Sequence, residues 1–409
     1  MAKFDTLDAL DVQGKRVLVR SDLNVPLRDG RVTDETRVRL SAQTIREIAD
    51  RGGRVVVLSH FGRPQGKSSP DFSLQPVADM LSRCIGRPVS FAHDCVGTVA
   101  KEAVDALAPG DIVLLENVRF HAQEEHNEPA FAQMLADLGD LYVNDAFSAA
   151  HRAHASTEGV ARILPSVAGR LLEAELNALG KALEVPTHPV AAVIGGAKVS
   201  TKLGVLKNLV RRVDVLVIGG GMANTFLAAQ GYEVGSSLCE HDLVSTACAV
   251  FDEAQASSCT IMLPMDVVVA QQPKEYAVTT IVPVTAVPRD HMILDMGPQS
   301  VADVIRRLKE CRTVVWNGPL GAFEIAPFDV ATVAVARSVA DLTGSGALLT
   351  VAGGGDTIAA LRRAGVHERF SYVSSAGGAF LEWLEGKPLP GVEALKRVPV
   401  PIGGEGLTS

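Results

Sequence analysis

The stretch RVLVRSDLNVP at residues 16–26 decides the fold class. It opens with the short β-branched apolar run Arg16–Arg20, which predicts a strand, and it continues into a polar turn that precedes a segment of helical periodicity. The same succession recurs along the chain. Strands are therefore predicted at Arg16–Arg20, Arg54–Ser59, Ile112–Leu115, Leu141–Val143, Val190–Ile194, Val213–Ile218, Thr260–Pro264, Thr313–Trp316, Ala347–Val351 and Ser371–Val373. Apolar strands that alternate with helices are typical of parallel sheets covered on both faces.

The chain of 409 residues is too long for one ordinary hydrophobic core, so we expect two domains. Apolar residues at helical spacing predict a single helix over Ser166–Glu184, and the prolines of the following segment 185–189 end it. We predict an α/β protein with two doubly wound, Rossmann-like parallel-sheet lobes joined by this helix and a hinge. The N-terminal lobe would comprise residues 1–170 plus 393–409, the linker 171–187 and the C-terminal lobe 188–392.

Composition narrows the functional classes. With 47% hydrophobic and 21% charged residues the chain resembles a soluble globular protein. It has neither the ~20-residue apolar run of a membrane span nor the apolar core of a secretion signal at its start, so we expect a cytoplasmic protein without a membrane partner. Six cysteines show no C-x-x-C pair and no zinc-ligand spacing, which predicts reduced thiols in the core.

The net charge of −8 argues against nucleic-acid binding, because phosphate backbones require a broad basic surface. Any anion site must then be local. Residues 1–170 hold 20 Lys and Arg, of which only four are Lys. Guanidinium groups present forked donors that suit phosphate and carboxylate.

Polar residues follow the predicted strands of the first half, where ligands bind in open parallel sheets. The four clusters are residues 20–26, 59–64, 116–120 and 144–154, with Arg37 and Arg39 after the first. Their position predicts one rim lined by Arg, His, Asn and Asp. The three-residue spacing of His151 and His154 would allow a metal pair, but no third ligand accompanies it, so substrate or capping roles are favoured.

Glycine-rich turns follow the predicted strands of the second half, at residues 195–202, 219–225, 317–324 and 353–357. Glycines at helix starts let backbone N–H groups approach an anion, which suits a nucleotide phosphate chain. Two standard motifs are absent. The segment 62–68 has one residue too few between its glycines for a P-loop, and Asn224 stands at the third glycine position of a dinucleotide fingerprint.

Taken together, these nine ordered motifs, which include Trp316–Glu324 and Leu384–Lys387, resemble the phosphoglycerate kinase family over nearly the whole chain. The resemblance implies a glycolytic phosphotransferase with a carboxyl group as acceptor, a monomer whose lobes close over a cleft. The small-molecule substrates would be 3-phosphoglycerate and ATP or ADP, with Mg²⁺ as cofactor. Ser148 and Ala149 depart from the Gly-Thr that the family often has, and Asn224 lies at a variable place.

The resemblance also implies site residues. Those for 3-phosphoglycerate would be Asp22, Asn24, Arg37, His60, Phe61, Gly62, Arg63, Arg119 and Arg152. Those for the nucleotide would be Lys202, Gly219, Gly220, Glu324, Gly354, Gly355, Asp356 and Thr357, with Asp356 on the metal and Glu324 on the ribose. Arg37 and Lys198 would be catalytic. Two alternatives stay open at this point: a non-catalytic two-lobed anion-binding protein and a nicotinamide-dependent dehydrogenase.

Overall fold

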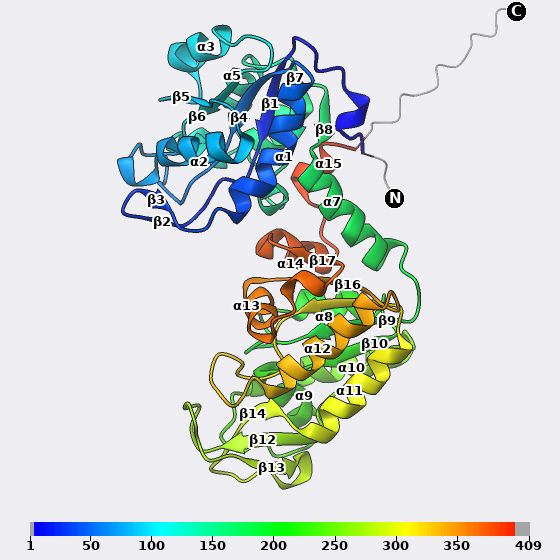
Figure 1. Ribbon diagram of the computed structural model, residues 1–409. Coiled ribbons are helices and arrows are strands. Elements are labelled where there is room, and N and C mark those ends of the chain that lie inside the picture. Colours follow the sequence, from blue (N-terminus) through cyan, green and yellow to red (C-terminus); the bar gives the residue numbers. More distant parts are fainter. Residues whose placement is uncertain (1–3, 397–409) are drawn as a thin grey trace, which may run out of the picture. The chain divides into compact units, whose positions relative to one another are not determined.

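The computed structural model describes residues 4–396 and divides the chain into two compact units (Figure 1). Within the described residues, unit 1 comprises 4–174 and 388–396, and unit 2 comprises 175–387. The division falls inside helix α7 (Arg170–Leu179). The predicted second lobe extended to residue 392, whereas residues 388–392 belong to unit 1. Gly391 explains the difference, because its N–H donates to the Ala150 carbonyl at 2.9 Å.

Unit 1 is built on a six-stranded parallel sheet in the order β5-β6-β4-β1-β7-β8. Its strands are β1 (Arg16–Arg20), β4 (Arg54–Leu58), β5 (Ser90–Ala92), β6 (Ile112–Leu115), β7 (Leu141–Asn144) and β8 (Ser166–Ala168). Every residue of β6 is buried, as expected for a sheet covered on both faces. A small antiparallel hairpin, β2 (Leu27–Arg28) and β3 (Arg31–Val32), follows β1.

Helices cover this sheet, and one large core joins α1 (Thr36–Asp50) and α2 (Gln75–Ile85) to β1 and β4. Ile45, Ile48 and Leu81 are fully buried in it. The other helices are α3 (Gly97–Asp105), α4 (Ala122–Glu125), α5 (Pro129–Ala136), α6 (Val160–Ile163) and α15 (Pro390–Glu393), with short turns η1 (Leu7–Ala9), η2 (Pro70–Phe72), η3 (Val118–Phe120), η4 (Phe147–Ala149) and the π-helical η5 (Ala155–Gly159).

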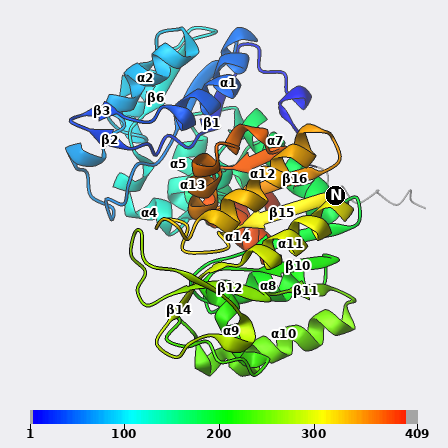
Figure 2. The same ribbon diagram turned by 60° about the horizontal axis from the view of Figure 1, so that its bottom comes forward.

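Unit 2 has its own six-stranded parallel sheet in the order β11-β10-β9-β15-β16-β17. The strands are β9 (Val190–Ile194), β10 (Val215–Ile218), β11 (Thr260–Met262), β15 (Thr313–Asn317), β16 (Leu349–Gly353) and β17 (Tyr372–Ser374). A separate antiparallel sheet of β12 (Asp266–Ala270), β13 (Thr280–Pro283) and β14 (Met292–Met296) lies beside α9 (Gly221–Ala229) (Figure 2).

The main core of unit 2 packs α11 (Pro298–Glu310) and α12 (Val330–Gly344) against β9 and β15. Trp316 is fully buried there and donates its indole N–H to the Gly318 carbonyl at 2.7 Å. The remaining helices are α8 (Leu203–Leu209), α10 (Val244–Ala256), α13 (Gly355–Ala364) and α14 (Gly377–Leu384), with short turns η7 (His241–Leu243), η8 (Val284–Ala286) and η9 (His367–Arg369) and the π-helical η6 (Gly180–Glu184).

The predicted α/β class with two parallel sheets is confirmed, and each predicted strand is present with its ends moved by at most two residues. The single helix predicted over Ser166–Glu184 is wrong. Residues 166–168 pair with β7 as strand β8, and Gly169 then turns the chain so tightly that a Cβ would lie 2.3 Å from Asp145 Oδ1. The prediction of core thiols is also wrong for Cys248, which is exposed.

No helix among the described residues is both long and apolar enough to cross a membrane.

Candidate functional site

The carboxyl ends of β6, β4, β1 and β7 are neighbours in the sheet of unit 1, and their loops hold the first candidate site. Asp22, in the loop after β1, is buried and contacts one cation, Arg37, and one hydroxyl group, that of Ser148. Its Oδ2 lies 3.1 Å from Arg37 Nη1 and accepts the Ser148 hydroxyl at 2.5 Å. The serine found where the family often has glycine therefore helps to hold the predicted ligand Asp22 in place.

A chain of hydrogen bonds connects the loop after β1 with the loops after β4 and β6. Arg37 Nη1 donates to the Asn24 carbonyl at 2.9 Å, and Asn24 Oδ1 accepts the Gly62 N–H at 3.0 Å. The Gly62 carbonyl in turn accepts Arg119 Nη1 at 2.8 Å. Four predicted site residues are thus linked through the backbone of one rim.

Arg119 is only 3% exposed, yet most of its donors are unused. Among residues 4–396 its Nε and Nη2 have no hydrogen-bond partner, although Nε lies 3.2 Å from Glu125 Oε1 as an ion pair without hydrogen-bond geometry. Burial, together with Arg152 and Arg20, lowers the pKa of Arg119 to about 10. Buried donors without hydrogen-bond partners are costly, so the unused nitrogens of Arg119 favour the binding of a further anion.

Three histidines share this excess of positive charge. Burial and the nearby arginines lower the pKa of His60 well below its usual value, that of His154 to about 3, and that of His151 more modestly. All three rings are therefore neutral at pH 7. The Nδ1 atoms of His151 and His154 are buried without a hydrogen-bond partner within the protein, so the surroundings of Arg119 offer further unused polar atoms.

A fully buried arginine behind the rim fixes the orientation of His60. Arg20 Nη2 lies 3.1 Å from His60 Nδ1, and because a guanidinium can only donate, Nδ1 must accept. The ring proton is then on Nε2, which is left to donate to a ligand. Arg20 itself is held by the Ser156 hydroxyl, which it reaches with Nε at 2.8 Å.

Glu124 completes this buried network and balances its charge. The carboxylate is fully buried and accepts the Ser156 hydroxyl at 2.5 Å and the Ser156 N–H at 2.8 Å. Burial raises the pKa of Glu124, and the charge of Arg20 opposes that rise. Sequence reasoning missed Arg20, Glu124 and Ser156 as supports of the site, because only the fold brings these three segments together.

Some rim residues singled out by their position after strands are structural. Asn117 joins loops, accepting the Phe61 N–H at 3.1 Å and donating to the Phe61 carbonyl at 2.7 Å. Asp145 accepts the N–H groups of Leu171 and Leu172 at the start of α7. Arg39 is exposed and pairs with Glu35. The contacts of Asn117 and Arg39 satisfy groups of the protein, whereas Asp145 Oδ2 is buried without a hydrogen-bond partner among the described residues.

The remaining predicted residues of unit 1 lie on the same loops. Phe61 is buried and Arg63 is exposed in the loop after β4, while Arg152 is half-buried after η4 and donates from Nε to His151 Nε2 at 3.1 Å. Arg152 also contributes to the lowered pKa values of Arg119 and His60, which places its charge beside theirs.

The second candidate site lies at the carboxyl ends of β9, β15 and β16 in unit 2. Lys202 Nζ donates to the Gly195 carbonyl at 2.6 Å and to the carbonyl and side-chain oxygens of Asn317 at 2.9 and 2.5 Å. Burial lowers the pKa of Lys202 to about 8, and the charge of Asp356 opposes that fall. The ammonium group is thus held at the meeting point of two glycine-rich turns.

A cavity of about 200 Å³ opens beside Lys202. Its lining also includes Asn317, Gly318, Gly354, Gly355, Asp356, Thr357, Gly377 and Leu381. Two glycines are required by geometry. Gly318 has φ +108°, and a Cβ there would lie 2.1 Å from the Gly195 carbonyl oxygen, while Gly354 has φ +101° just before α13. The first N–H groups of α13 therefore face a glycine-lined hollow, an arrangement that favours phosphate.

The other nucleotide predictions are distributed differently. Gly220 lines a smaller cavity with Leu320 and Asn224, whereas Gly219 does not line it. Glu324 is exposed and does not line the cavity beside Lys202. Lys198 is exposed in the loop after β9. Asn224, the residue that breaks the dinucleotide fingerprint, is buried and donates to the Leu238 carbonyl at 3.0 Å.

The lining of the larger cavity fits a hard divalent cation. Asp356 is its carboxylate, exposed in the first turn of α13, and Mg²⁺ is typically held by one or two carboxylates together with substrate phosphates. Neither cysteine nor histidine lines this cavity, so the donors present suit Mg²⁺ better than a thiophilic metal.

Comparisons with known proteins identify the family of the chain. The family model described as phosphoglycerate kinase matches residues 7–387. The phosphoglycerate kinases of Methylorubrum extorquens strain PA1 and Xanthobacter autotrophicus are each 62% identical over 397 residues, covering 97% of this chain and 99% and 100% of their own lengths. The structure of phosphoglycerate kinase from Coxiella burnetii is similar with a TM-score of 0.90 at 42% identity, covering 96% of this chain and 99% of that one.

Because the family model and these relatives each cover nearly the whole chain, the chain belongs to the phosphoglycerate kinase family.

Proposed function

We propose that this chain transfers a phosphoryl group reversibly between 1,3-bisphosphoglycerate and Mg-ADP, giving 3-phosphoglycerate and Mg-ATP. Its family makes it a phosphotransferase of glycolysis with a carboxyl group as acceptor. Unit 1 would bind the phosphoglycerate and unit 2 the nucleotide. Membership of this family argues against the two alternatives, a non-catalytic anion-binding protein and a nicotinamide-dependent dehydrogenase.

One observation carries the assignment of the phosphoglycerate to unit 1. Arg119 is buried beside Arg20 and Arg152, and two of its nitrogens have no hydrogen-bond partner among the described residues, which supports a multiply charged anion at that point. Asp22 and Asn24 lie on the same rim and add polar groups that could recognise a hydroxyl group. A substrate with phosphate, carboxylate and hydroxyl groups uses all of these partners.

The reaction in the direction of ATP consumption needs no general base in this chain. A carboxyl group titrates near ~4, so 3-phosphoglycerate arrives as a carboxylate nucleophile at neutral pH. This chain would instead align donor and acceptor and surround the moving phosphoryl group with positive charge. We assign this role to Arg37 and Lys198, one from each unit, which requires the units to close on both substrates during the reaction.

In unit 2, Lys202 and the N-terminus of α13 would hold the nucleotide phosphates, with Thr357 and Gly355 at the same turn. Asp356 would hold Mg²⁺, which when bound neutralises charge on the phosphate oxygens. Glu324 is assigned to the ribose. A cytoplasmic location and a monomeric state complete the proposal, and the latter is checked by sedimentation of the purified chain with and without substrates.

The proposed reaction is tested by its product. Purified chain given ATP, Mg²⁺ and 3-phosphoglycerate should form an acyl phosphate, which hydroxylamine traps as a hydroxamate. Omission of 3-phosphoglycerate is the control for ATP hydrolysis alone. Absence of hydroxamate from folded protein would overturn the assignment.

The two catalytic assignments are tested by charge removal. Arg37→Ala and Lys198→Ala should each lower kcat by on the order of 10²- to 10³-fold, as for loss of a preorganised donor to a developing charge. Two variants that remove exposed cations nearby in the chain serve as matched controls. Arg39→Ala lies on α1, which also holds Arg37, and Lys207→Ala lies on α8, which follows the loop of Lys198. Near-normal turnover in a folded Arg37 or Lys198 variant would refute that residue's role.

A further inference from the structure

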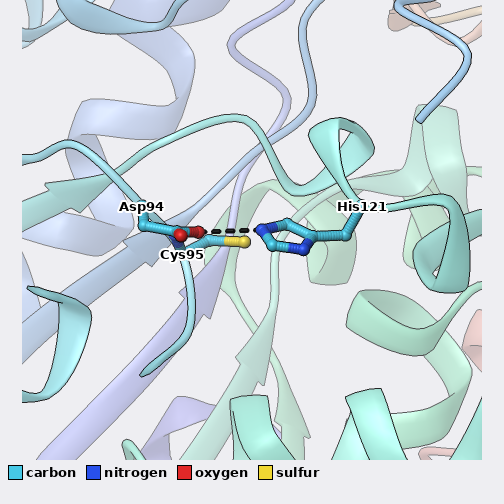
Figure 3. Close-up of side chains that lie close together, drawn as sticks. All are labelled: Asp94, Cys95 and His121. Atoms are coloured by element: carbon cyan, nitrogen blue, oxygen red, sulfur yellow. Dashed lines mark hydrogen bonds and ion pairs between the residues drawn. The ribbon is translucent and has the colours of Figure 1, made fainter. Parts of the chain in front are cut away.

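Three side chains of different chemistry converge in unit 1 between the loop after β5 and the start of α4. Asp94, Cys95 and His121 each offer one ligand atom, a carboxylate oxygen, a thiol sulfur and an imidazole nitrogen, and these atoms lie within 4.8 Å of one another (Figure 3). His121 Nε2 is 2.8 Å from Asp94 Oδ1. Ligand atoms around a tetrahedral zinc ion, with bonds of about 2.0–2.3 Å, lie about 3.3–3.8 Å apart, so these three atoms would need only small shifts to surround an ion.

The surrounding structure holds all three groups before any ion arrives. Asp94 Oδ1 also accepts the Cys95 N–H at 2.7 Å, which fixes the carboxylate on the loop. The His121 ring packs on Phe131 with 5.1 Å between ring centroids, and His121 is the residue directly before α4. Cys95 is fully buried, and its sulfur points toward the His121 ring (Figure 3).

The proposed phosphoryl transfer uses none of these residues. Among the described residues the Cys95 sulfur makes no hydrogen bond and no disulfide, while Asp94 and His121 are partly exposed and can be reached from solvent. A cation would balance the charge of the Asp94 carboxylate.

We propose that Asp94, Cys95 and His121 form a binding site for a thiophilic divalent cation of the Zn²⁺ class, distinct from the magnesium site of the nucleotide. One thiolate, one imidazole and one carboxylate are a donor set for zinc or cobalt, whereas Mg²⁺ takes oxygen ligands. Binding breaks the His121–Asp94 hydrogen bond, moves the ring proton of His121 from Nε2 to Nδ1, forms metal bonds to Nε2 and Asp94 Oδ1, and releases the Cys95 thiol proton to solvent. A water molecule would fill the fourth position.

The ion would connect two segments that border the phosphoglycerate site. His121 directly follows the turn η3, which contains Arg119, and Cys95 lies just before α3. Cation binding therefore fixes the backbone that follows Arg119 to the loop after β5. The site would stabilise unit 1, and its test needs neither substrate nor nucleotide.

Cobalt provides the direct test. The full-length chain, freed of metal and nucleotide, is titrated with Co²⁺ alone while absorption is recorded. We expect a thiolate-to-cobalt charge-transfer band in the near ultraviolet together with visible bands of a four-coordinate ion, and loss of both when Zn²⁺ is added in competition. No thiolate band at millimolar Co²⁺ would overturn the proposal.

Variants decide which thiol is responsible. Cys95→Ser should abolish the band, whereas Cys239→Ser should leave it, and the latter is the matched control because Cys239 Sγ lies 3.8 Å from His241 Nδ1 in unit 2. A band that survives Cys95→Ser in folded protein would refute the site.

The partly exposed ligands keep the test decisive if Cys95→Ser does not fold. Loss of a residue that only hydrogen-bonds to a metal ligand lowers metal affinity about 10- to 100-fold. Loss of a ligand itself should cost at least as much, so Asp94→Asn and His121→Gln should each weaken Co²⁺ binding at least about tenfold. Unchanged affinity in both variants would likewise overturn the proposal. Hydroxamate formation by the same proteins is measured separately, so failure of this site and failure of the proposed reaction are distinguishable.

Discussion

Replacement of Arg119 by methionine should separate substrate binding from stability. Methionine fills a similar buried volume without charge. The fall of the Arg119 pKa from 12.5 to about 10 corresponds to about 3 kcal/mol of destabilisation by the buried charge. Because Arg119 is protonated in both folded and unfolded chains below pH ~10, this penalty is fully present at neutral pH and would be relieved only between pH ~10 and ~12.5.

Two opposing effects set the stability of the variant. Methionine removes the penalty of about 3 kcal/mol, but it also removes the hydrogen bond from Nη1 to the Gly62 carbonyl, and a charged hydrogen bond is worth about 1.5–3 kcal/mol. The two nearly cancel. We expect the free energy of unfolding of the ligand-free variant to lie within about 1.5 kcal/mol of the parent value.

Binding should respond very differently. The two unpaired nitrogens of Arg119 are the donors we assign to the substrate, and the loss of even two weak charge-assisted bonds lowers affinity by on the order of 100-fold. At a 3-phosphoglycerate concentration 100 times Kd, the parent gains about 2.7 kcal/mol of stability. A variant with Kd raised 100-fold would gain only about 0.4 kcal/mol at that concentration.

Urea unfolding of both proteins, with and without 3-phosphoglycerate, measures both quantities at once. Arg162→Met, which removes an exposed arginine paired with Glu158, is the control. A ligand-free Arg119→Met protein destabilised by more than about 3 kcal/mol would show that Arg119 is a structural anchor. Full retention of the ligand-induced stabilisation would refute its role in binding.

Three further predictions concern protonation. His60→Gln should keep 3-phosphoglycerate affinity within about tenfold, because glutamine can accept a hydrogen bond from Arg20 and donate one to the ligand. His60→Ala should lose more affinity. Calorimetry measures both affinities, and equal losses would contradict the assigned tautomer. Raising the pH from 7 to 9 should weaken Mg-ADP binding as Lys202, with a pKa of about 8, loses its proton, and Lys202→Met should bind more weakly with that step absent. Burial raises the pKa of Glu175 to about 7 from its ordinary value of 4.5, so the folded chain holds an extra proton and its stability falls as the pH rises from about 4.5 to 7. Glu175→Gln should remove this fall of about 3 kcal/mol, measured by urea unfolding across that pH range. An unchanged pH profile would contradict the prediction.

Much of the fold could be predicted because its main strands are buried on both faces. Runs such as Arg54–Leu58 and Val190–Ile194 are short, continuous and mainly apolar, and polar turns follow them. A helix would instead show apolar residues spaced three or four positions apart over a longer segment. Edge elements were missed for the opposite reason. Strands β5 and β8 are three residues long, and β13 is mostly exposed, so their sequences carry no strong apolar pattern.

For the candidate sites, local sequence determined which residues follow the strands, and topology then brought those loops to one edge. Glycines at positions 318 and 354 are readable as turns, and the structure adds that a side chain at 318 would collide with the Gly195 carbonyl. The sequence gives no means of distinguishing Asn117, which joins loops, from Arg119, which keeps two nitrogens unpaired. Both occur in the same short motif.

The sequence by itself determined the α/β class, the division into two lobes and the residues of one family's motifs. Only the tertiary structure decided which polar groups are already satisfied, since hydrogen-bond partners such as Glu124 and Ser156, or Asp94 and His121, come from segments far apart in the chain. It also decided the protonation of His60, because the state of a buried imidazole depends on the charges that folding places around it. Burial and partnership are properties of three-dimensional proximity, which local sequence does not encode.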